Sequence, residues 1–457
     1  MCPNDGFSSD RCMKTWWTAL SCAAFTSSVI GLASPIWAQE QPQEFTRPSG
    51  VLTFGQELEY DFDEGLQTRT LFGLTLFRAT RTQTLSFSVG TEYRGDFRDD
   101  RDDDLFFDNS RAELRYSIRS ATTSLSFAAR LRDLDLEEDP FELEPGVLLI
   151  NELGTVTTAD IAARLETGIE RPFGITLDAS YRDSSFSGAV DADLSDETIL
   201  NVDALARFNL TRSLSLRALA GLRQTDEDDL TQTETETTFF GFGLGTVSRG
   251  GLSFSGDILF DDSEITTNTA TRESNDGLGF VITVNQPRPN GLVGAEIISR
   301  IDEAGRRTSA ELIRELTLPT GGLALSLGVV DQEGVDDLQF IGEIAYRREM
   351  SRGAVSVSLA QGATTNDEDT LVSTNVRINY QAPINSVSSW QAGLGFLQTD
   401  ELLTNETDSE TTASFSYQRD LASDWSMETG IELSRDDDGD EENTFFFNIQ
   451  RDITFGF

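Results

Sequence analysis

The sequence predicts an all-β chain that forms a single transmembrane antiparallel up-and-down β-barrel of about 22 strands, within a range of roughly 18 to 24. Segments that alternate apolar and polar residues recur along the chain, which is the pattern of strands with one apolar face. The connections between them alternate between short turns and longer acidic loops. After residue 40, no apolar run is long enough for a membrane helix. The mean hydropathy of −0.29 fits a barrel, because alternation hides the apolar face.

A secretory signal peptide is expected at the amino-terminus, with Met13 as an alternative start. Lys14 gives it a positive beginning, an apolar stretch follows, and Ile36-Trp37-Ala38 supplies a cleavage site. Cys22 raises a lipoprotein alternative, which the poor lipobox before it disfavours. An uncleaved anchor is also disfavoured. The expected order is a signal peptide, a short polar lead-in that is too short for a plug domain, and the barrel, at residues 1–38, 39–50 and 51–457.

The predicted strands follow from the period of two. The clearest segments cover 52–60, 72–76, 85–93, 112–118, 125–131, 200–208, 214–222, 252–260, 323–329, 372–380, 390–396 and 427–433. Segments at 297–318 and 335–346 alternate less clearly, which is why the predicted strand count has a range.

Short turns are predicted at one end of the barrel and longer acidic loops at the other. The turns are expected at 79–80, 120, 172–173, 211–212, 249–250, 287–289, 319–321, 351–352, 383–386 and 422–423. The longer loops are expected at 96–108, 133–152, 226–236, 400–410 and 436–442. The last strand runs toward the short-turn end, so both termini are expected at that end.

The closing strand is the clearest single segment, FFFNIQRDITFGF at residues 445–457. One of its faces is apolar apart from Arg451, and the other is mostly polar. The strand ends on Phe, and in this it resembles the closing strand of bacterial outer-membrane β-barrels. The resemblance, to the broad class of outer-membrane barrels and porins, implies a Gram-negative outer-membrane location with periplasmic turns. It also implies an assembly signal read by the barrel-assembly machinery, formed by Phe445, Phe447, Ile449, Ile453, Phe455 and Phe457.

Aromatic residues near strand ends predict two girdles at the membrane surfaces, where amphipathic rings prefer the headgroup level. Tyr60, Tyr93 and Tyr181 lie beside longer loops. The second girdle, toward the short turns, comprises Tyr116, Tyr346, Tyr380, Tyr417, Trp390 and Trp425. The expected membrane partners are outer-membrane lipid and lipopolysaccharide.

The amino-acid composition excludes most kinds of catalytic, metal-binding and nucleic-acid-binding site. The net charge is −43, so nucleic-acid binding is not expected. The chain has no histidine, Lys14 is its one lysine, and Cys2, Cys12 and Cys22 all precede the expected cleavage site. Serine–histidine and serine–lysine pairs, disulfides and the usual zinc or haem ligand sets are therefore excluded after cleavage. Carboxylate-pair hydrolysis alone stays open. We expect no enzyme and no cofactor.

The acidic loops have two interpretations. One is loosely bound Ca²⁺ or Mg²⁺, which would bridge to lipopolysaccharide. Its candidate ligands are Asp102, Asp104, Asp436, Asp438 and Asp440. The other, which we favour, is a solvated charged rim. The spacing does not fit an EF-hand, because Glu441 stands where that loop needs glycine. In either case an acidic mouth concentrates cations.

Polar residues opposite the apolar phase are expected to face the lumen. They are Arg111, Glu113, Arg115, Arg119, Asp203, Arg207, Arg217 and Arg377. They would line water in a wide pore or form a paired polar core in a narrow barrel, and the sequence leaves both open.

The longest loop, 131–158, contains an apolar stretch at 147–150. Three alternatives stay open for it: a constriction in the lumen, a contact with a neighbouring subunit, or an extra hairpin.

The function predicted from these features is a porin-like channel for small polar solutes that favours cations. The alternative is a barrel for secretion or exopolysaccharide export, or a structural barrel, without an open pore. The sequence does not decide the oligomeric state.

Overall fold

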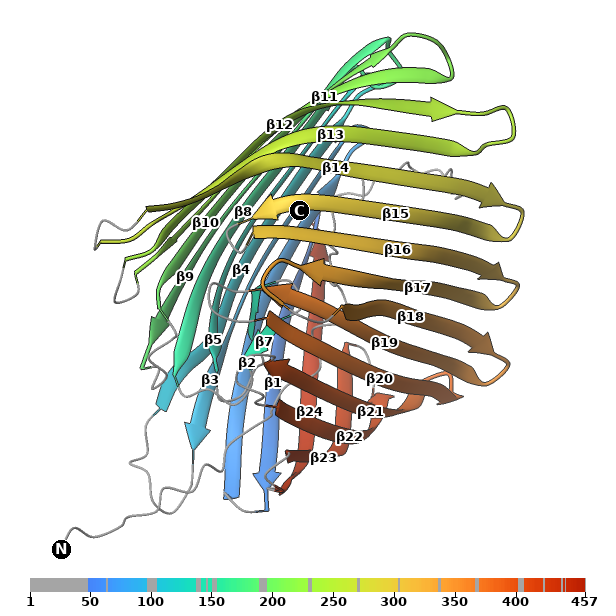
Figure 1. Ribbon diagram of the computed structural model, residues 1–457. Coiled ribbons are helices and arrows are strands. Elements are labelled where there is room, and N and C mark those ends of the chain that lie inside the picture. The colour runs from blue at the N-terminus through green and yellow to red at the C-terminus, as the bar shows by residue number, and fades with distance from the viewer. Residues whose placement is uncertain are drawn as a thin grey trace, which may run out of the picture.

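A computed structural model of the chain shows one closed barrel of 22 antiparallel strands (Figure 1). It describes residues 48–456 apart from 63–64, 97–104, 137–140, 145–146, 150–153, 189–194, 229–231, 269–271, 303–304, 336–337, 366–369, 402–406, 422–423, 437–438 and 440. The expected signal peptide, 1–38, and most of the lead-in lie outside the described residues. No helix within the described ranges is long and apolar enough to span a membrane.

The strands pair with their neighbours in chain order, except that β8 follows β5 in the barrel because β6 and β7 form a separate two-stranded sheet. Their bounds are β1 (Ser49–Asp61), β2 (Gly65–Ala79), β3 (Gln83–Asp96), β4 (Leu105–Arg119), β5 (Thr123–Asp135), β6 (Phe141–Glu144), β7 (Val147–Leu149), β8 (Thr155–Thr167), β9 (Phe173–Ser187), β10 (Glu197–Asn209), β11 (Leu214–Glu227), β12 (Glu234–Val247), β13 (Ser253–Thr266), β14 (Arg272–Arg288), β15 (Gly291–Asp302), β16 (Gly305–Leu318), β17 (Gly321–Gln332), β18 (Gln339–Met350), β19 (Gly353–Thr365), β20 (Thr370–Asn385), β21 (Ser388–Glu401), β22 (Thr407–Asp420), β23 (Trp425–Asp436) and β24 (Glu441–Gly456).

Pairing between the first and last strands closes the barrel. Ser49 lies opposite Gly456, and Asp61 lies opposite Thr444, so β1 and β24 are paired over the whole length of β1. Closure removes the free edges of the sheet. This is what a membrane-spanning sheet requires, because lipid cannot satisfy unpaired backbone groups. The first strand begins at Ser49, two residues inside the lead-in expected at 39–50, since its pairing with β24 continues to that residue.

The two ends of the barrel differ as predicted. The turn end, where β1 begins and β24 finishes, carries short connections such as 289–290, 319–320, 351–352 and 386–387. The short turns predicted from the sequence fall at or beside connections at this end, and the one predicted at 422–423 lies outside the described residues. The loop end carries the longest connection, 136–154.

Some predicted acidic loops are shorter than expected. The segment expected as a loop at 400–410 is mostly strand, because β21 runs to Glu401 and β22 begins at Thr407. The loop expected at 436–442 narrows in the same way to residues 437–440. Acidic side chains are compatible with a strand that extends beyond the bilayer, since they stay in water while the backbone remains paired.

The long connection forms an extra hairpin. β6 and β7 pair antiparallel with each other. The apolar stretch predicted at 147–150 coincides with β7, except for Ile150, which lies outside the described residues. Where the long connection leaves the barrel wall, Leu136 and Val156 are buried and pack with Leu134 and Phe186.

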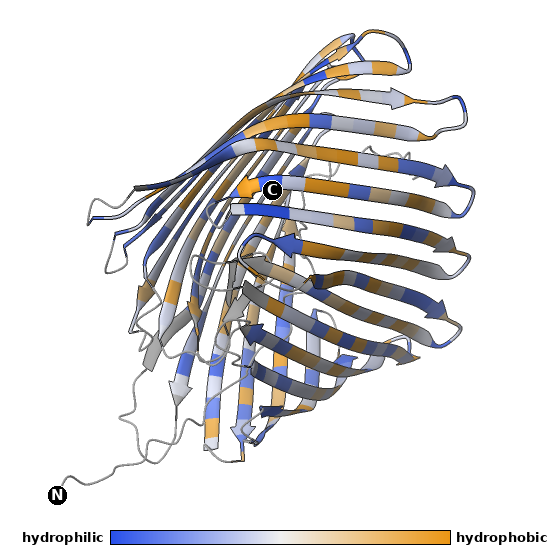
Figure 2. Ribbon diagram, in the orientation of Figure 1, coloured by the Kyte–Doolittle hydropathy of each residue, from blue (hydrophilic) through white to orange (hydrophobic). Residues whose placement is uncertain are grey.

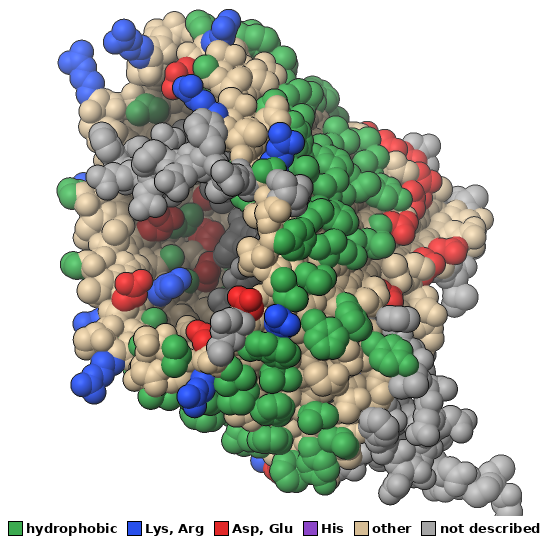
Figure 3. Space-filling model, turned by 180° about the vertical axis from the view of Figure 1, so that it is seen from behind, with side chains coloured by type: hydrophobic (Ala, Val, Ile, Leu, Met, Phe, Trp, Pro, Cys, Tyr) green, Lys and Arg blue, Asp and Glu red, His purple; other side chains and the backbone are tan. Residues whose placement is uncertain are grey.

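The outer face of the barrel is an apolar belt. Phe242 is 71% exposed, Leu327 is 67% exposed and Phe340 is 65% exposed, because they point away from the barrel wall. Figure 2 shows hydrophobic and hydrophilic residues alternating along the strands, and Figure 3 shows hydrophobic side chains covering the outer surface. The buried side chains are mostly polar, for example Asp61, Gln67 and Asp261. An apolar exterior around a polar interior is the inverse of a soluble protein and suits a barrel surrounded by lipid.

Candidate functional site: the charged lumen

The inner wall can be followed residue by residue from the strand register. In β10, Val202 points outward and is 38% exposed, whereas the next residue, Asp203, lines an interior cavity. Asp203 lies opposite Asp178 of β9, which therefore shares the inner face. The same alternation holds around the barrel, because neighbouring residues of a strand point to opposite faces. Figure 3 shows acidic side chains within the barrel opening.

Two groups of ion pairs lie on the inner wall between β4 and β9. The Glu113 carboxylate accepts a hydrogen bond from Arg115 at 2.5 Å and another from Arg130 of β5 at 3.5 Å. Asp160 of β8 lies between Arg132 and Arg182, at 3.9 Å and 2.9 Å. These residues are neighbours only after folding, because strand pairing places β5, β8 and β9 side by side. The charges are partly exposed, so each pair remains available to water and solutes.

An interior cavity of about 480 Å³ lies along the inner faces of β3 to β10. Arg164 and Asp178 face each other at 3.4 Å in its wall, and both are more than 40% exposed. Asn201 and Asp203 join them from β10. The other polar side chains of the wall are Arg115 and the hydroxyls of Thr84, Ser86, Ser117, Ser126 and Ser180. This donor and acceptor set can hydrogen-bond a small polar solute, and its size is typical of ligand sites.

Two further ion pairs span a whole strand. Arg217 of β11 reaches Asp257 of β13 at 2.6 Å, although β12 lies between them. The residue of β12 in this row is Gly243, and a Cβ there would lie 1.6 Å from the Asp257 carboxylate. The ion pair therefore depends on a position without a side chain. Arg300 of β15 similarly reaches Asp261 of β13 at 2.9 Å across β14.

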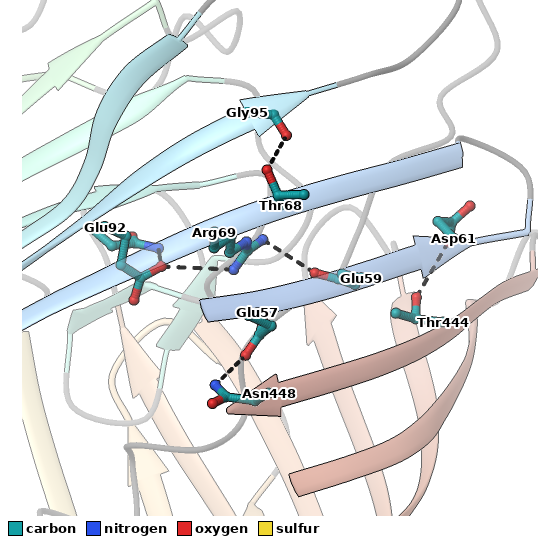
Figure 4. Close-up of polar contacts among 10 residues, drawn as sticks. Glu57, Glu59, Asp61, Thr68, Arg69, Glu92, Gly95, Thr444 and Asn448 are labelled. Atoms are coloured by element: carbon teal, nitrogen blue, oxygen red, sulfur yellow. Dashed lines mark hydrogen bonds and ion pairs between the residues drawn. The ribbon is translucent and has the colours of Figure 1, made fainter. Parts of the chain in front are cut away.

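A polar network lines the seam where the barrel closes (Figure 4). Arg69 of β2 lies between Glu59 at 3.7 Å and Glu92 at 4.0 Å. Across the seam, Asn448 donates to Glu57 at 2.9 Å, and Thr444 donates to Asp61 at 3.3 Å, so β24 and β1 are joined by side chains as well as backbone. Glu59 and Arg69 are almost fully buried.

The wall has two halves of opposite charge. Arginines gather on the inner faces of β2 to β11: Arg69, Arg94, Arg111, Arg115, Arg130, Arg132, Arg164, Arg182, Arg207, Arg217 and Arg223. Fewer carboxylates share this half: Glu92, Glu113, Asp160, Glu166, Asp178, Glu197, Asp203 and Glu227.

Carboxylates gather on the inner faces from β13 round to β1: Asp257, Asp261, Glu296, Glu311, Glu343, Glu410, Glu428, Glu432, Asp452, Glu57 and Glu59. Their cationic neighbours are Arg300, Arg307, Arg347 and Arg377. A solute inside the lumen is therefore exposed to a cationic wall on one side and an anionic wall on the other.

The residues predicted to face the lumen all lie on the inner face. They are Arg111, Glu113, Arg115 and Arg119 of β4, Asp203 and Arg207 of β10, Arg217 of β11 and Arg377 of β20. Sequence reasoning missed Arg69, Arg164, Asp257 and Asp261. The polar phase of each strand contained the signal that they point inward, but nothing in the sequence shows which of them meet.

The predicted girdle residues all lie on the outward face. The set is Tyr60, Tyr93, Tyr116, Tyr181, Tyr346, Tyr380, Tyr417, Trp390 and Trp425. Near the turn end, Tyr380 packs on Trp390 with ring centroids 5.0 Å apart, and Trp390 packs on Phe415 at 5.9 Å. The Tyr380 hydroxyl donates to the carbonyl of Arg352 at 3.2 Å. Their depth in a bilayer stays a prediction.

The closing strand shows the predicted faces. Phe445, Phe447, Ile449, Ile453 and Phe455 point outward, and Phe457 lies outside the described residues. Arg451, the one polar residue in that row, lies over the ring of Trp425 at 5.5 Å. A cation over an aromatic face is stabilised there, which explains how the row accommodates a charge. The role of this strand as an assembly signal stays a prediction.

The predicted cation site is largely outside the described residues, which exclude Asp102, Asp104, Asp438 and Asp440. Asp436 is described and ends β23. Where the chain is described, no group of three or more His, Cys, Asp or Glu is placed to hold a metal ion. Binding of Ca²⁺ or Mg²⁺ at the acidic loops stays a prediction.

Solved structures with this architecture are known. The chain folds as an outer-membrane β-barrel. The FrpB iron transporter from Neisseria meningitidis (F5-1 variant) aligns with a TM-score of 0.58 and 7% identity, over 89% of this chain and 83% of that chain. The ferric-catecholate import receptor Fiu from E. coli K12 aligns with a TM-score of 0.56 and 12% identity, over 89% of this chain and 82% of that chain. The ferric enterobactin receptor PfeA from Pseudomonas aeruginosa aligns with a TM-score of 0.54 and 11% identity, over 89% of this chain and 82% of that chain.

At these identities the likeness is one of fold. The sequence matches none of the family models and none of the curated proteins with which it was compared.

Proposed function

We propose that the barrel passes small polar solutes across the outer membrane through its charged lumen. The observation that supports this most is the cavity wall of β3 to β10, where Arg115, Arg164, Asp178 and Asp203 line space large enough for a small molecule. Aqueous passage needs side chains that replace the water of a solute, and hydroxyls with charges of both signs supply such partners.

The channel is proposed to favour cations. The net charge of −43 and the acidic segments at the loop end concentrate cations at that mouth. The arginine half of the wall opposes this preference inside the lumen. Removing positive charge from it should therefore raise the preference for cations.

Planar-bilayer recording in a salt gradient tests this proposal. We expect stepwise channels and a reversal potential on the cation side. Arg115→Gln and Arg164→Gln together should move the reversal potential further toward the cation limit. Arg288→Gln and Arg348→Gln together are the matched control, because they remove the same amount of positive charge from outward positions of β14 and β18. A protein that inserts but never conducts would contradict the proposal and favour a scaffold or a closed secretion barrel.

A second candidate is a receptor for anionic iron chelates. The resemblance in fold to import receptors for ferric catecholates motivates it, together with the arginine half of the wall. Binding of a ferric catecholate, followed by quenching of the fluorescence of Trp390 and Trp425, distinguishes it from a general channel. Saturable quenching that weakens in Arg115→Gln supports a receptor, and its absence supports a channel.

We infer no enzymatic role for the lumen, and neither candidate needs a cofactor. The wall residues are Arg, Asp, Glu and amide or hydroxyl side chains, and the chain has no histidine. Incubation with oligosaccharides and chromatography of the products tests the one hydrolytic chemistry left open by the composition.

A further inference from the structure

Four outward-facing rows of side chains carry an arginine near the turn end. The strands concerned, β2, β14, β18 and β22, all run toward this end. In the middle of the barrel wall these rows are mostly apolar or aromatic, and toward the turn end they carry Arg78, Arg288, Arg348 and Arg419, with Gln286 before Arg288 and Met350 after Arg348. The outward phase follows from the pairing, since Arg78 lies opposite Leu85, an exposed outer residue, and Arg419 lies two residues beyond Tyr417. We name these four residues the arginine rim.

The arginine rim is exposed and unpaired. All four side chains are exposed. None of them makes a hydrogen bond or ion pair to another residue of the described chain. Several lumen arginines, by contrast, have carboxylate partners, as Arg217 has in Asp257. In a chain with 35 cationic and 78 acidic residues, four unpaired arginines in equivalent places are not explained by a shortage of partners.

Aromatic residues beside two members of the arginine rim indicate a headgroup layer. Arg348 follows Tyr346 by two residues on the outer face of β18, and Arg419 follows Tyr417 in the same way on β22. Tyr417 lies opposite Trp390. Because such aromatic rings settle at the membrane interface, the guanidinium groups one step further along lie where lipid phosphates are found.

The opposite end has the opposite charge. On the outer face near the loop end, Asp262 lies opposite Asp276, and Glu236 lies opposite Glu264. Figure 3 shows basic side chains, together with some acidic ones, around the opening at the turn end, and acidic ones beyond the far edge of the hydrophobic belt. The outer surface therefore distinguishes the two leaflets by charge.

We propose that the arginine rim binds the phosphate headgroups of anionic phospholipids in the leaflet at the turn end. A guanidinium group donates two parallel hydrogen bonds to a phosphate and keeps its charge at any physiological pH, so it suits this ligand better than a simple positive charge. The surface would gather an annulus of anionic lipid and fix the depth and direction of the barrel in the membrane. This inference does not depend on what crosses the lumen.

Tryptophan quenching tests the inference, because Trp390 and Trp425 are the only tryptophans after residue 38 and both lie toward the turn end. The chain beginning at Gln39, which contains every barrel strand, is folded into phosphatidylcholine vesicles that contain brominated phosphatidylglycerol or, separately, brominated phosphatidylcholine. We expect stronger quenching by the anionic lipid, with a local enrichment on the order of fivefold for a headgroup beside a surface arginine. The difference should shrink as salt is added.

The decisive variant replaces Arg78, Arg288, Arg348 and Arg419 with Gln. The tryptophan fluorescence of this variant should be quenched equally by the two brominated lipids. The matched control replaces the inner-face residues Arg111, Arg115, Arg119 and Arg207 with Gln, removes the same charge and should keep the preference. Replacing the arginine rim with Lys should keep part of it, and two-residue variants serve if the fourfold change prevents folding. Equal quenching by both lipids in the unmodified protein overturns the proposal, as does a preference that persists without the rim or disappears in the control.

Discussion

Substitution of Gly243 by Ala should break an ion pair in which Gly243 itself takes no part. A Cβ at this position of β12 would lie 1.6 Å from the Asp257 carboxylate. An ordinary contact is about 3.5 Å, so the carboxylate has to move by about 2 Å. The bond from Arg217, now 2.6 Å, would then lengthen beyond hydrogen-bonding distance. Asp257 is 3% exposed and Arg217 is 9% exposed, so both charges would remain in a poorly solvated place.

The expected loss is about 3 kcal/mol of unfolding free energy, because separating a buried ion pair leaves charges without compensation. Urea or guanidinium unfolding of the barrel in detergent or vesicles, followed by tryptophan fluorescence, measures it. Gly256→Ala on the neighbouring strand is the control. A Cβ there would meet the Phe254 ring at 3.6 Å, an ordinary contact, so the change should be close to neutral.

A double substitution isolates the cause. In a protein that already carries Arg217→Ala and Asp257→Ala, the change Gly243→Ala should cost much less, because no carboxylate occupies the space. If Gly243→Ala costs as much in that background as in the unmodified protein, the strand-spanning ion pair is not the reason for the glycine, and the explanation fails.

Other predictions concern the outer face. Arg451→Ala should destabilise the barrel by about 1 kcal/mol through loss of its contact with Trp425, and a shift in tryptophan emission should accompany the loss; an unchanged spectrum would contradict it. Tyr380→Phe should cost about 1 kcal/mol, the value of its hydrogen bond to Arg352, in the same unfolding assay. Phe242→Arg, at a residue 71% exposed to the outside, should cost about 2–4 kcal/mol if it faces lipid, whereas Ser180→Arg on the inner face should cost less.

The strand count and the turns could be predicted because both depend on local patterns. Alternation in segments such as 200–208 reports which residues share a face, and β10 preserves those faces. Pro and Gly mark turns such as 319–320. Acidic residues misled the prediction of loop length at 400–410, because a carboxylate above the bilayer is solvated equally well on a strand or in a loop.

The arrangement of the lumen could not be predicted in the same way. Alternation shows that Arg217 points inward, but its partner Asp257 is on the next strand but one, and register decides whether they meet. Gly243 appears in the sequence as one of several alternating glycines, and its role depends on what the two flanking strands place beside it. The division of the wall into two charged halves likewise appears only when the sheet is closed.

Labelling of single cysteines tests the central claim most directly, because no cysteine follows Cys22 in the chain. Val202→Cys and Asp203→Cys, introduced separately into the chain beginning at Gln39, place a thiol on opposite faces of β10. In vesicles a charged, water-soluble maleimide should label Asp203→Cys, and it should label Val202→Cys only after unfolding. Equal labelling of both thiols in the folded protein would contradict a barrel with lipid outside and water inside.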